Sequence, residues 1–492
     1  MEIETELNLS LTPGVASRLA KHPLLTEATA VRERVINTYY DTPDRRLQRE
    51  HVVVQYRKSG SIWLSSVSRA ALSEDQDAEG AQWEVAGEPG EFDFSHVGDS
   101  GLRRWLESLR EDLRPAFTTN FTRSAWLLEP RAGVRIELAL DRGWIVGEGR
   151  RQAICEVGLE LLSGSSGDLF SAASELQSDF SLHPEVTSKF QRGYRVLAEA
   201  SPQAVKAVPV QTNAGMSTVA AFRTIALACL RHLQSNEQGL RETDNPEFVH
   251  QARVAIRRLR SAIRIWRPLL SGEFVSRFDP LWQTLAGHLG EARNWDVFLT
   301  ETLPTIALAF PEDSACGRLS AYAQRRCAIN REGARSALQS VAYSRLLLDF
   351  TAALLALPEQ DAGRLDAFAP ACLDKRARQV SQLAVDALAG DAAARHRLRV
   401  SYKRLRYALE FFAPLFPGEV LRNYHVSASG LQELLGRLND LAVAVQLTDE
   451  ALPGDAGAVI RSWLEAQSEG LLPELRGWLN DFYQHPVPWR NQ

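Results

Sequence analysis

Polar and apolar residues alternate in several short segments within the first 200 residues. In the segment 134–141, apolar side chains take every second position, and charged side chains fill most of the positions between them. A period of two residues is typical of a strand with one buried and one solvated face. The segments 2–9, 52–58, 62–69 and 154–161 show the same alternation. The pattern predicts an N-terminal domain, residues 1–200, built mainly of antiparallel strands.

The pattern changes after residues 201–215, a segment with two prolines and no periodic apolar positions, which we interpret as a linker. From residue 216 to residue 492 the chain is rich in Leu, Ala and Arg and follows the helical period. Prolines mark the expected ends of the helices: Pro268, Pro304, Pro358, Pro414 and Pro453. The second domain is therefore predicted to be all-helical.

One stretch of the helical domain occurs twice. The pattern H-x-x-R-V-x-x-[RK]-R-L-R begins at His250 and again at His396, and 396 − 250 = 146. The same offset relates Leu289-Gly290 to Leu435-Gly436, so the register continues beyond the motif. This agreement indicates a duplicated unit, with repeats at about residues 216–345 and 346–492.

Each copy of the motif places a row of cations on one face of a predicted helix. At about 100° per residue, the histidine and the basic residues share one side, and apolar residues take the other. Such a row is ordinarily a solvated face. Ligand binding is favoured here because the first row has few acids at i+4 positions and because both copies keep the row. Guanidinium groups without interleaved aromatic side chains suit a phosphate chain, whereas single-stranded nucleic acid usually requires aromatic stacking.

Carboxylates gather on the polar faces of the N-terminal strands. An antiparallel sheet with one solvated face is the simple interpretation. Acids that would repel one another are tolerated when they share a hard divalent cation, and such cations bridge to phosphates. The candidate metal ligands are Glu4, Glu6, Glu137, Asp141, Glu156 and Glu160, with Arg57, Arg123 and Arg135 among them as candidate phosphate ligands.

Composition narrows the classes of function. The chain of 492 residues is 45% apolar and 24% charged, which is typical of a globular protein with more than one domain. The net charge of −5 argues against a nucleic-acid partner, although the average hides the basic rows. The five cysteines lack any C-x-x-C pattern, which argues against a zinc site or a disulfide framework. The N-terminus has no signal-peptide pattern and no apolar run reaches the roughly 20 residues of a membrane span, so we expect a cytoplasmic protein.

Residues 2–195 resemble the CYTH family, the triphosphate tunnel metalloenzymes. The shared motifs are E-x-E at residues 4–6, NTYYDTP at 37–43, RIELALDRG at 135–143, ICEVGLEL at 154–161 and SKFQRGY at 188–194. The resemblance implies an eight-stranded antiparallel tunnel that hydrolyses triphosphate with Mg²⁺ or Mn²⁺. It implies catalytic roles for Glu4, Glu6 and Lys189, and triphosphate binding by Arg57, Arg123, Arg135, Lys189 and Arg192.

The chain departs from the CYTH pattern at three positions where a cation is usual. These positions hold Asn8, Gln55 and Ser68. Each lost charge-assisted contact costs about 1.5–3 kcal/mol of binding free energy. A weak or inactive tunnel is therefore an alternative to an active one.

Residues 216–485 resemble the CHAD domain, a histidine-containing α-helical module. The resemblance rests on the duplicated motif and on the later segments LGEARNWDV (289–297) and LGRLNDLAV (435–443). It implies two helical bundles related by a pseudo-twofold axis and binding of inorganic polyphosphate. The residues expected to bind it are His250, Arg253, Arg257, Arg258, Arg260, Arg264, His396, Arg399, Lys403, Arg404 and Arg406.

Together these features predict a multidomain α+β protein. It has an N-terminal antiparallel β-barrel tunnel with flanking helices and a C-terminal all-α domain of two pseudo-symmetric helical bundles. The expected function is polyphosphate handling, in which the helices bind polyphosphate and the tunnel hydrolyses triphosphate with a divalent metal. The alternatives are an inactive polyphosphate-binding or targeting protein and a nucleic-acid binder that uses the basic helices. We expect a cytoplasmic protein that associates with polyphosphate granules. We do not expect it to bind a membrane.

Overall fold

The structure, a computed structural model, describes residues 6–26, 28–60, 62–69, 82–197, 202–311, 314–359, 363–389, 392–416, 418–484, 487 and 489. Glu4 lies outside these residues. The chain forms two compact units, Met1–Gln203 with Leu347–Ala352, and Ala204–Leu346 with Ala353–Gln492. Among the described residues no helix is long and apolar enough to cross a bilayer, and the five cysteines are free thiols.

The N-terminal unit is built on one antiparallel sheet of nine strands in the order β5-β4-β3-β2-β6-β7-β8-β1-β9. The strands are β1 Glu6–Ser10, β2 Val31–Asp41, β3 Val52–Ser59, β4 Ile62–Arg69, β5 Gln82–Ala86, β6 Arg114–Leu128, β7 Arg135–Gly147, β8 Arg150–Ser163 and β9 His183–Pro184. The prediction of an antiparallel N-terminal sheet is confirmed. A ninth strand of two residues joins the eight that were expected.

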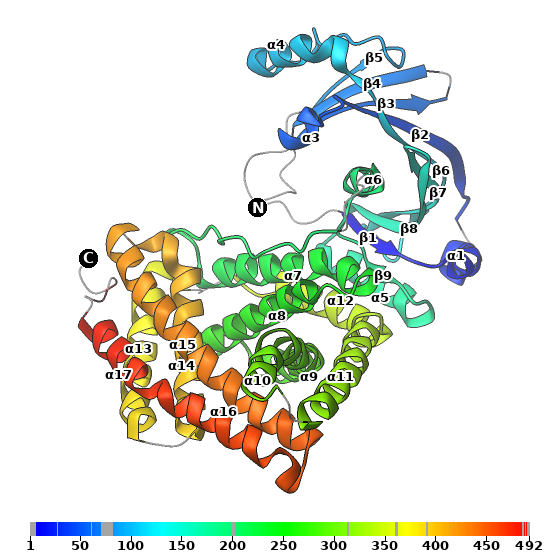
Figure 1. The fold of residues 1–492 in the computed structure, drawn as a ribbon. Helices are drawn as coiled ribbons and strands as arrows, with labels where there is room; N and C mark the ends of the chain where they lie inside the picture. The colour runs from blue at the N-terminus through cyan, green and yellow to red at the C-terminus, as the bar shows by residue number, and fades with distance from the viewer. Residues whose placement is uncertain are drawn as a thin grey trace. The chain divides into compact units, whose positions relative to one another are not determined.

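Short helices flank the sheet: α1 Pro13–Leu19, α2 Pro23–Thr26, α3 Arg46–Arg49, α4 Ser100–Leu109, α5 Ser166–Asp179 and α6 Lys189–Leu197. The sheet curves around α6, which lies on its concave side (Figure 1). Gly193 of α6 sits so close to Phe117 that an added Cβ would come within 2.0 Å of the ring. The Tyr194 hydroxyl donates a hydrogen bond of 2.6 Å to Asp41. These contacts fix α6 against β6 and the end of β2.

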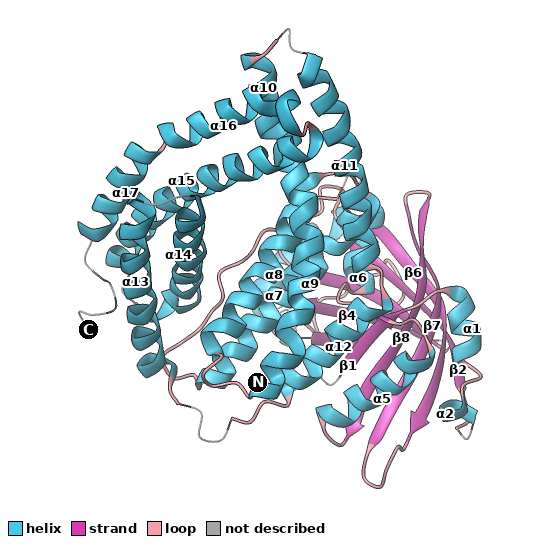
Figure 2. Cartoon of the chain, turned by 90° about the horizontal axis from the view of Figure 1, so that it is seen from below, coloured by secondary structure: helices cyan, strands magenta, loops and turns pink. Residues whose placement is uncertain are grey.

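The second unit is helical (Figure 2). The helices from residue 218 onward are α7 Thr218–Glu242, α8 Pro246–Trp266, α9 Gly272–Val297, α10 Leu303–Ala309, α11 Ser314–Leu338, α12 Val341–Leu355, α13 Leu365–Ala389, α14 Ala392–Phe412, α15 Gly418–Ala451, α16 Ala458–Gly470 and α17 Leu472–Gln484, and the middle of α12 groups with the first unit. A π-helical turn, Phe298–Thr302, joins α9 to α10. The prediction of an all-α second region is confirmed.

The duplication is visible in the helix bounds. Adding 146 to the limits of α8, 246 and 266, gives 392 and 412, the limits of α14. Trp266 and Phe412 are equivalent under this offset, and their rings pack together with centroids 5.5 Å apart. Pro246 begins α8, and the Asn245 side chain accepts a hydrogen bond from the Glu247 amide, which caps the helix.

The segment that precedes α7 is irregular but tied to the helical unit. Both backbone polar groups of Val205 bond to the buried Asn236 side chain on α7, at 2.9 Å each. Further along, the Thr212 hydroxyl donates to the Phe411 carbonyl at 2.9 Å. Side chains thus replace the hydrogen bonds that a helix or strand would supply.

Candidate functional sites

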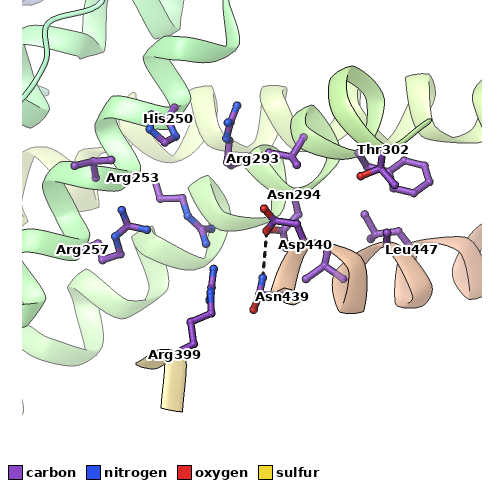
Figure 3. A pocket seen from close by; sticks show the side chains of 15 residues that line it. His250, Arg253, Arg257, Arg293, Asn294, Thr302, Arg399, Asn439, Asp440 and Leu447 are labelled. Atoms are coloured by element: carbon purple, nitrogen blue, oxygen red, sulfur yellow. Dashed lines mark hydrogen bonds between the residues drawn. The ribbon is translucent and has the colours of Figure 1, made fainter. Parts of the chain in front are cut away.

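Basic side chains surround a cavity of about 140 Å³ in the helical unit. Figure 3 shows Arg253 and Arg257 of α8, Arg293 of α9 and Arg399 of α14 around it. His250 lines the same cavity, and Asp440 of α15 is the one acidic side chain in its lining. Glu301, which is not in the lining, lies 3.6 Å from Arg293. The guanidinium groups of Arg253, Arg257 and Arg399 therefore share a small volume with little opposite charge.

The cavity lies where the two repeats meet. Under the offset of 146, five pairs of its lining residues are equivalent: Arg253 with Arg399, Arg293 with Asn439, Asn294 with Asp440, Val297 with Val443, and Phe298 with Ala444. Equivalent residues of both copies therefore line one shared site. The arginine pair obeys the symmetry, whereas Arg293 and Asp440 break it.

Burial and mutual repulsion act on these cations. Burial, followed by the charges of Arg257 and Arg399, lowers the pKa of Arg253 to about 10. The same causes, burial first and then Arg257, Arg399 and Arg253, lower the pKa of Lys403 to about 6. Burial also lowers the pKa of Arg399, and Asp440 only partly offsets this effect. A bound polyanion would remove the repulsion, so the site is electrostatically prepared for one.

Several of the other basic residues in the two predicted rows form ion pairs with carboxylates of the protein. Arg258 is 1% exposed, and its Nε lies 2.7 Å from Glu410. The Arg260 Nε lies 2.9 Å from Asp279, and that of Arg264 lies 4.0 Å from the same carboxylate. Four further predicted residues do not line the cavity: Lys403 and Arg404 are half-buried, His396 is exposed, and Arg406 pairs with Glu410 at 3.4 Å.

In the N-terminal unit, the register brings charged residues into rows across the sheet. Directly paired residues project from the same face. One row runs from Glu33 through Arg123, Asp141 and Glu156 to Ser10. A second row, four residues away along β7, contains Glu137, Glu160 and Glu6.

The first row and the start of α6 form a buried ion-pair cluster. Arg123 makes a bidentate contact with Asp141, with both hydrogen bonds 2.8 Å long. The Lys189 ammonium lies 2.9 Å from Asp141 and also contacts Glu156, which pairs in turn with Arg192. Asp141 and Glu156 are 2% and 3% exposed. The bidentate contact raises the pKa of Arg123, so this cation keeps its charge.

Family models match both parts of the chain. The CYTH domain model matches residues 2–194, and the CHAD domain model matches residues 224–449. The chain carries a CYTH domain and a CHAD domain. The predicted resemblance is therefore confirmed for both regions.

The chain is also similar to individual proteins. The CHAD domain of the plant Ricinus communis is 30% identical, with a TM-score of 0.52, and the match covers 58% of this chain and 98% of that one. PptA from Streptomyces chartreusis is 16% identical, with a TM-score of 0.44, over 55% of this chain and 100% of that one. An inorganic triphosphatase of Haemophilus influenzae is 28% identical over 209 residues. That match covers 39% of this chain and 54% of the relative, so it spans about half of the relative's length.

The acids of the CYTH domain can be tested for metal binding. Carboxylate oxygens are the ligands that Mg²⁺ and Mn²⁺ favour. However, cations of the chain already occupy Asp141 and Glu156. Among the described residues, which exclude Glu4, no group of three or more Asp, Glu, His or Cys side chains is placed to hold an ion. The described carboxylates therefore do not form a metal site as they stand.

The positions that lack a usual cation lie on three different strands of the CYTH sheet. Gln55 on β3 pairs with Ser66, and Ser68 on β4 pairs with Gln82, while Ser66 also pairs with the acid Glu84. Asn8 on β1 donates a hydrogen bond of 3.0 Å to Glu6. The remaining predicted phosphate ligands, Arg57 and Arg135, are exposed. The buried ion-pair cluster is therefore confined to β6–β8 and α6.

The CHAD site contains cavity residues that the sequence did not reveal. Arg293 and Asp440 lie in segments noted for their similarity between the repeats, 289–297 and 435–443. Their counterparts are Asn294 for Asp440 and Asn439 for Arg293, so a search for repeated charges misses both. Proximity to the duplicated motif in the repeat register is the signal that could have found them.

Proposed function

We propose that this protein handles inorganic phosphate chains. Its CHAD domain binds inorganic polyphosphate, and its CYTH domain binds and hydrolyses inorganic triphosphate with a divalent metal. The observation that carries the proposal is the CHAD cavity, where four arginines face a single carboxylate. Binding of this kind would also place the protein at polyphosphate granules.

The symmetry of the cavity favours polyphosphate over nucleic acid. A linear polyphosphate chain reads the same in both directions, so two equivalent arginines, Arg253 and Arg399, can grip it from both repeats. A nucleic-acid strand has a direction, and its bases require stacking surfaces. Phe298 is the one aromatic residue in the lining. Guanidinium forks bind phosphate oxygens in pairs, which suits a dense polyanion.

Three of the predicted stripe residues in the CHAD domain support this proposal most directly. Arg253, Arg257 and Arg399 line the cavity, and Lys403 repeats Arg257 in the second motif. The proposal assigns phosphate binding to these four residues and to Arg293. Arg258 and Arg260 are held by Glu410 and Asp279, and they would help to hold the helices in place.

For the CYTH domain, support comes from the family match and from the relative named as an inorganic triphosphatase. Arg123 and Lys189 are cations that retain access to solvent, with side chains 32% and 19% exposed. We assign them to phosphate binding and orientation. CYTH enzymes generally depend on a divalent metal, and Mg²⁺ or Mn²⁺ would supply charge neutralisation and water activation. The carboxylates outside the ion-pair cluster, Glu6, Glu137 and Glu160, are the candidates to approach it.

Charge reversal in the CHAD cavity tests the proposal. The double variant Arg257→Glu/Lys403→Glu should lose polyphosphate binding by at least a hundredfold in calorimetry, because two attractive contacts become repulsive. Release of phosphate from triphosphate should be unchanged. Arg397→Glu, an exposed position on α14, is the control and should bind nearly as the unchanged protein does. Polyphosphate binding that persists in the double variant would place the ligand elsewhere.

Two further measurements address the alternative functions. Short single-stranded or duplex DNA should not displace polyphosphate at equal phosphate concentration, and displacement would favour a nucleic-acid binder. Phosphate release from triphosphate with Mg²⁺ or Mn²⁺ should exceed that of a Glu4→Ala/Glu6→Ala variant. Equal rates would favour a polyphosphate-binding protein with an inactive tunnel.

A further inference from the structure

The ion-pair cluster of the CYTH domain contains three cations and two carboxylates within contact distance. Arg123 and Lys189 meet at Asp141, and Lys189 and Arg192 meet at Glu156. The cluster itself therefore carries one excess positive charge. Two further acids influence Arg123: Glu33, which is exposed and stands opposite it on β2, and Glu137 on β7. Because three cations already contact Asp141 and Glu156, these two carboxylates have little negative charge left to attract a further cation.

The helix that supplies two of these cations is fixed. Gly193 has no room for a side chain against Phe117, and Tyr194 is bonded to Asp41. At the other end of α6, Arg45 donates a hydrogen bond of 2.8 Å to the Leu197 carbonyl. The carboxylates could therefore be released to a metal only if the cation side chains moved, because the helix backbone is anchored directly after Arg192 and at its C-terminal end.

The three cations differ in their access to solvent. The Arg192 side chain is 7% exposed, so a ligand cannot reach it without opening the fold. Lys189 is 19% exposed, and its ammonium has a third N–H beyond those directed at Asp141 and Glu156. Arg123 is 32% exposed and uses Nε and one terminal nitrogen on Asp141, which leaves Nη1 without a hydrogen-bond partner among the described residues. Two donor groups thus remain for a phosphate.

We infer that the CYTH domain binds the phosphate chain at Arg123 and Lys189 without a divalent metal. Asp141 and Glu156 act as positioning residues for these cations and are not metal ligands. This inference rests on the proposed function and deepens it, since it separates phosphate binding from the metal-dependent step of hydrolysis. It also departs from the expectation that Asp141 and Glu156 hold the metal.

The pairing explains how a tunnel with fewer cations can still hold an anion. Asn8 on β1, Gln55 on β3 and Ser68 on β4 lack the charge that is usual there, so binding depends on the cations that remain. Held by Asp141 and Glu156, Lys189 and Arg123 lose little side-chain entropy when a phosphate arrives, because their rotamers are already fixed. A metal that took these carboxylates would release both cations and raise that cost.

Calorimetry with inorganic triphosphate in EDTA tests the inference. The full chain with Arg257→Glu/Lys403→Glu serves as the background, so that the CHAD cavity does not contribute. Triphosphate should bind in EDTA with an affinity within about tenfold of that measured with Mg²⁺. Lys189→Gln should weaken binding in EDTA by about tenfold or more. Lys58→Gln is the matched control, because Lys58 is exposed and projects from the face of β3 opposite to that of Arg57. This variant should change the affinity for triphosphate less than about twofold.

Asp141→Asn distinguishes a positioning residue from a metal ligand. The neutral amide no longer holds Lys189 and Arg123 by charge, so triphosphate binding in EDTA should weaken severalfold, and Asp141→Glu should restore the original affinity. A metal ligand would instead show loss of Mn²⁺ binding, measured by electron paramagnetic resonance. Melting temperatures identify variants that fail to fold, in which case Lys189→Gln carries the test.

The outcomes separate the inference from the proposed function. Triphosphate binding that appears only with Mg²⁺ or Mn²⁺, or Mn²⁺ binding that folded Asp141→Asn abolishes, would overturn the inference and leave hydrolysis intact. Absence of triphosphate binding under both conditions would instead overturn the proposed function of the CYTH domain.

Discussion

The CHAD cavity and the CYTH cluster use the same kinds of side chain in opposite ways. In the CHAD cavity, Asp440 is the one acid that lines the site with Arg253, Arg257, Arg293 and Arg399, and Glu301 pairs with Arg293 alone at 3.6 Å. In the CYTH cluster, each carboxylate contacts two cations directly. The cations of the CHAD cavity repel one another, and a bound anion would reduce this repulsion. The ion pairs of the CYTH cluster stabilise the fold without a ligand.

A basic surface can bind an anion only to the extent that its positive charges are not already paired with acids of the protein. Lys403 and Lys189 differ in this respect. The pKa of Lys403 is lowered to about 6 by burial among cations. Lys189 lies 2.9 Å from one carboxylate and contacts a second. A polyanion would therefore gain more binding free energy at Lys403, whereas it would meet Lys189 already held in place by carboxylates.

Removal of one cation from the CYTH cluster should have the largest effect on stability. Arg192→Met leaves the buried Glu156 with one partner, and we expect the free energy of unfolding to fall by about 3–5 kcal/mol. Urea unfolding of the full chain measures it. Arg131→Met is the control, because its pair with Asp168 is at the surface, with the arginine 64% exposed. A loss below about 1 kcal/mol at Arg192 would show that the cluster does not stabilise the fold.

The affinity of the CHAD site for polyphosphate should depend on pH through Lys403. In the empty CHAD site, Lys403 is largely neutral above its pKa of about 6, and a bound polyanion favours its charged form. Binding above this pH therefore takes up a proton, so affinity should fall as pH rises from about 6 to 9. The limit is about tenfold per pH unit for one proton.

Lys403→Met provides the control for this pH dependence. The variant should show a shallower fall in polyphosphate affinity with pH, because what remains reflects titration of the ligand and of other groups. Calorimetry at several pH values in buffers of different ionisation enthalpy also counts the protons taken up. Equal slopes in both proteins would contradict the role of Lys403.

A smaller change is expected when the single acid of the CHAD cavity is neutralised. Asp440 raises the pKa values of Arg253, Arg399 and Lys403, so it acts as an internal counter-ion. Asp440→Asn should tighten polyphosphate binding by about threefold to tenfold, or roughly 1 kcal/mol. Asp366→Asn, an exposed acid paired with Arg364, should have less effect. Weaker binding in Asp440→Asn would mean that this carboxylate positions the arginines.

Replacement of an arginine of the CHAD cavity should have the smallest effect, a change of about 1 kcal/mol or less in the free energy of unfolding. Arg399→Met removes a half-buried cation whose pKa is lowered by burial, so the free energy of unfolding should stay within about 1 kcal/mol of the original or rise. The same variant should weaken polyphosphate binding. A loss of stability similar to that of Arg192→Met would remove the contrast between the two sites.

The sequence by itself determined the elements and their repetition. Alternation with a period of two predicted the antiparallel strands, and the offset of 146 placed α14 at the residues equivalent to α8. These features depend on local geometry, because side chains repeat every 2 residues in a strand and every 3.6 in a helix. For the same reason, Arg253 and Arg257 could be placed on one face of the first helix and Arg399 on the equivalent face of the second.

Only the tertiary structure decided which charges are free. Asp279 reaches Arg260 from α9, and Glu410 reaches Arg258 from α14, although few acids stand at i+4 in the first stripe. Arg192 pairs with Glu156, 36 residues away along the chain. Coulomb interactions depend on distance and burial, which the fold sets and no spacing in the sequence reports. The cation rows were therefore readable from the sequence, and their availability to a ligand was not.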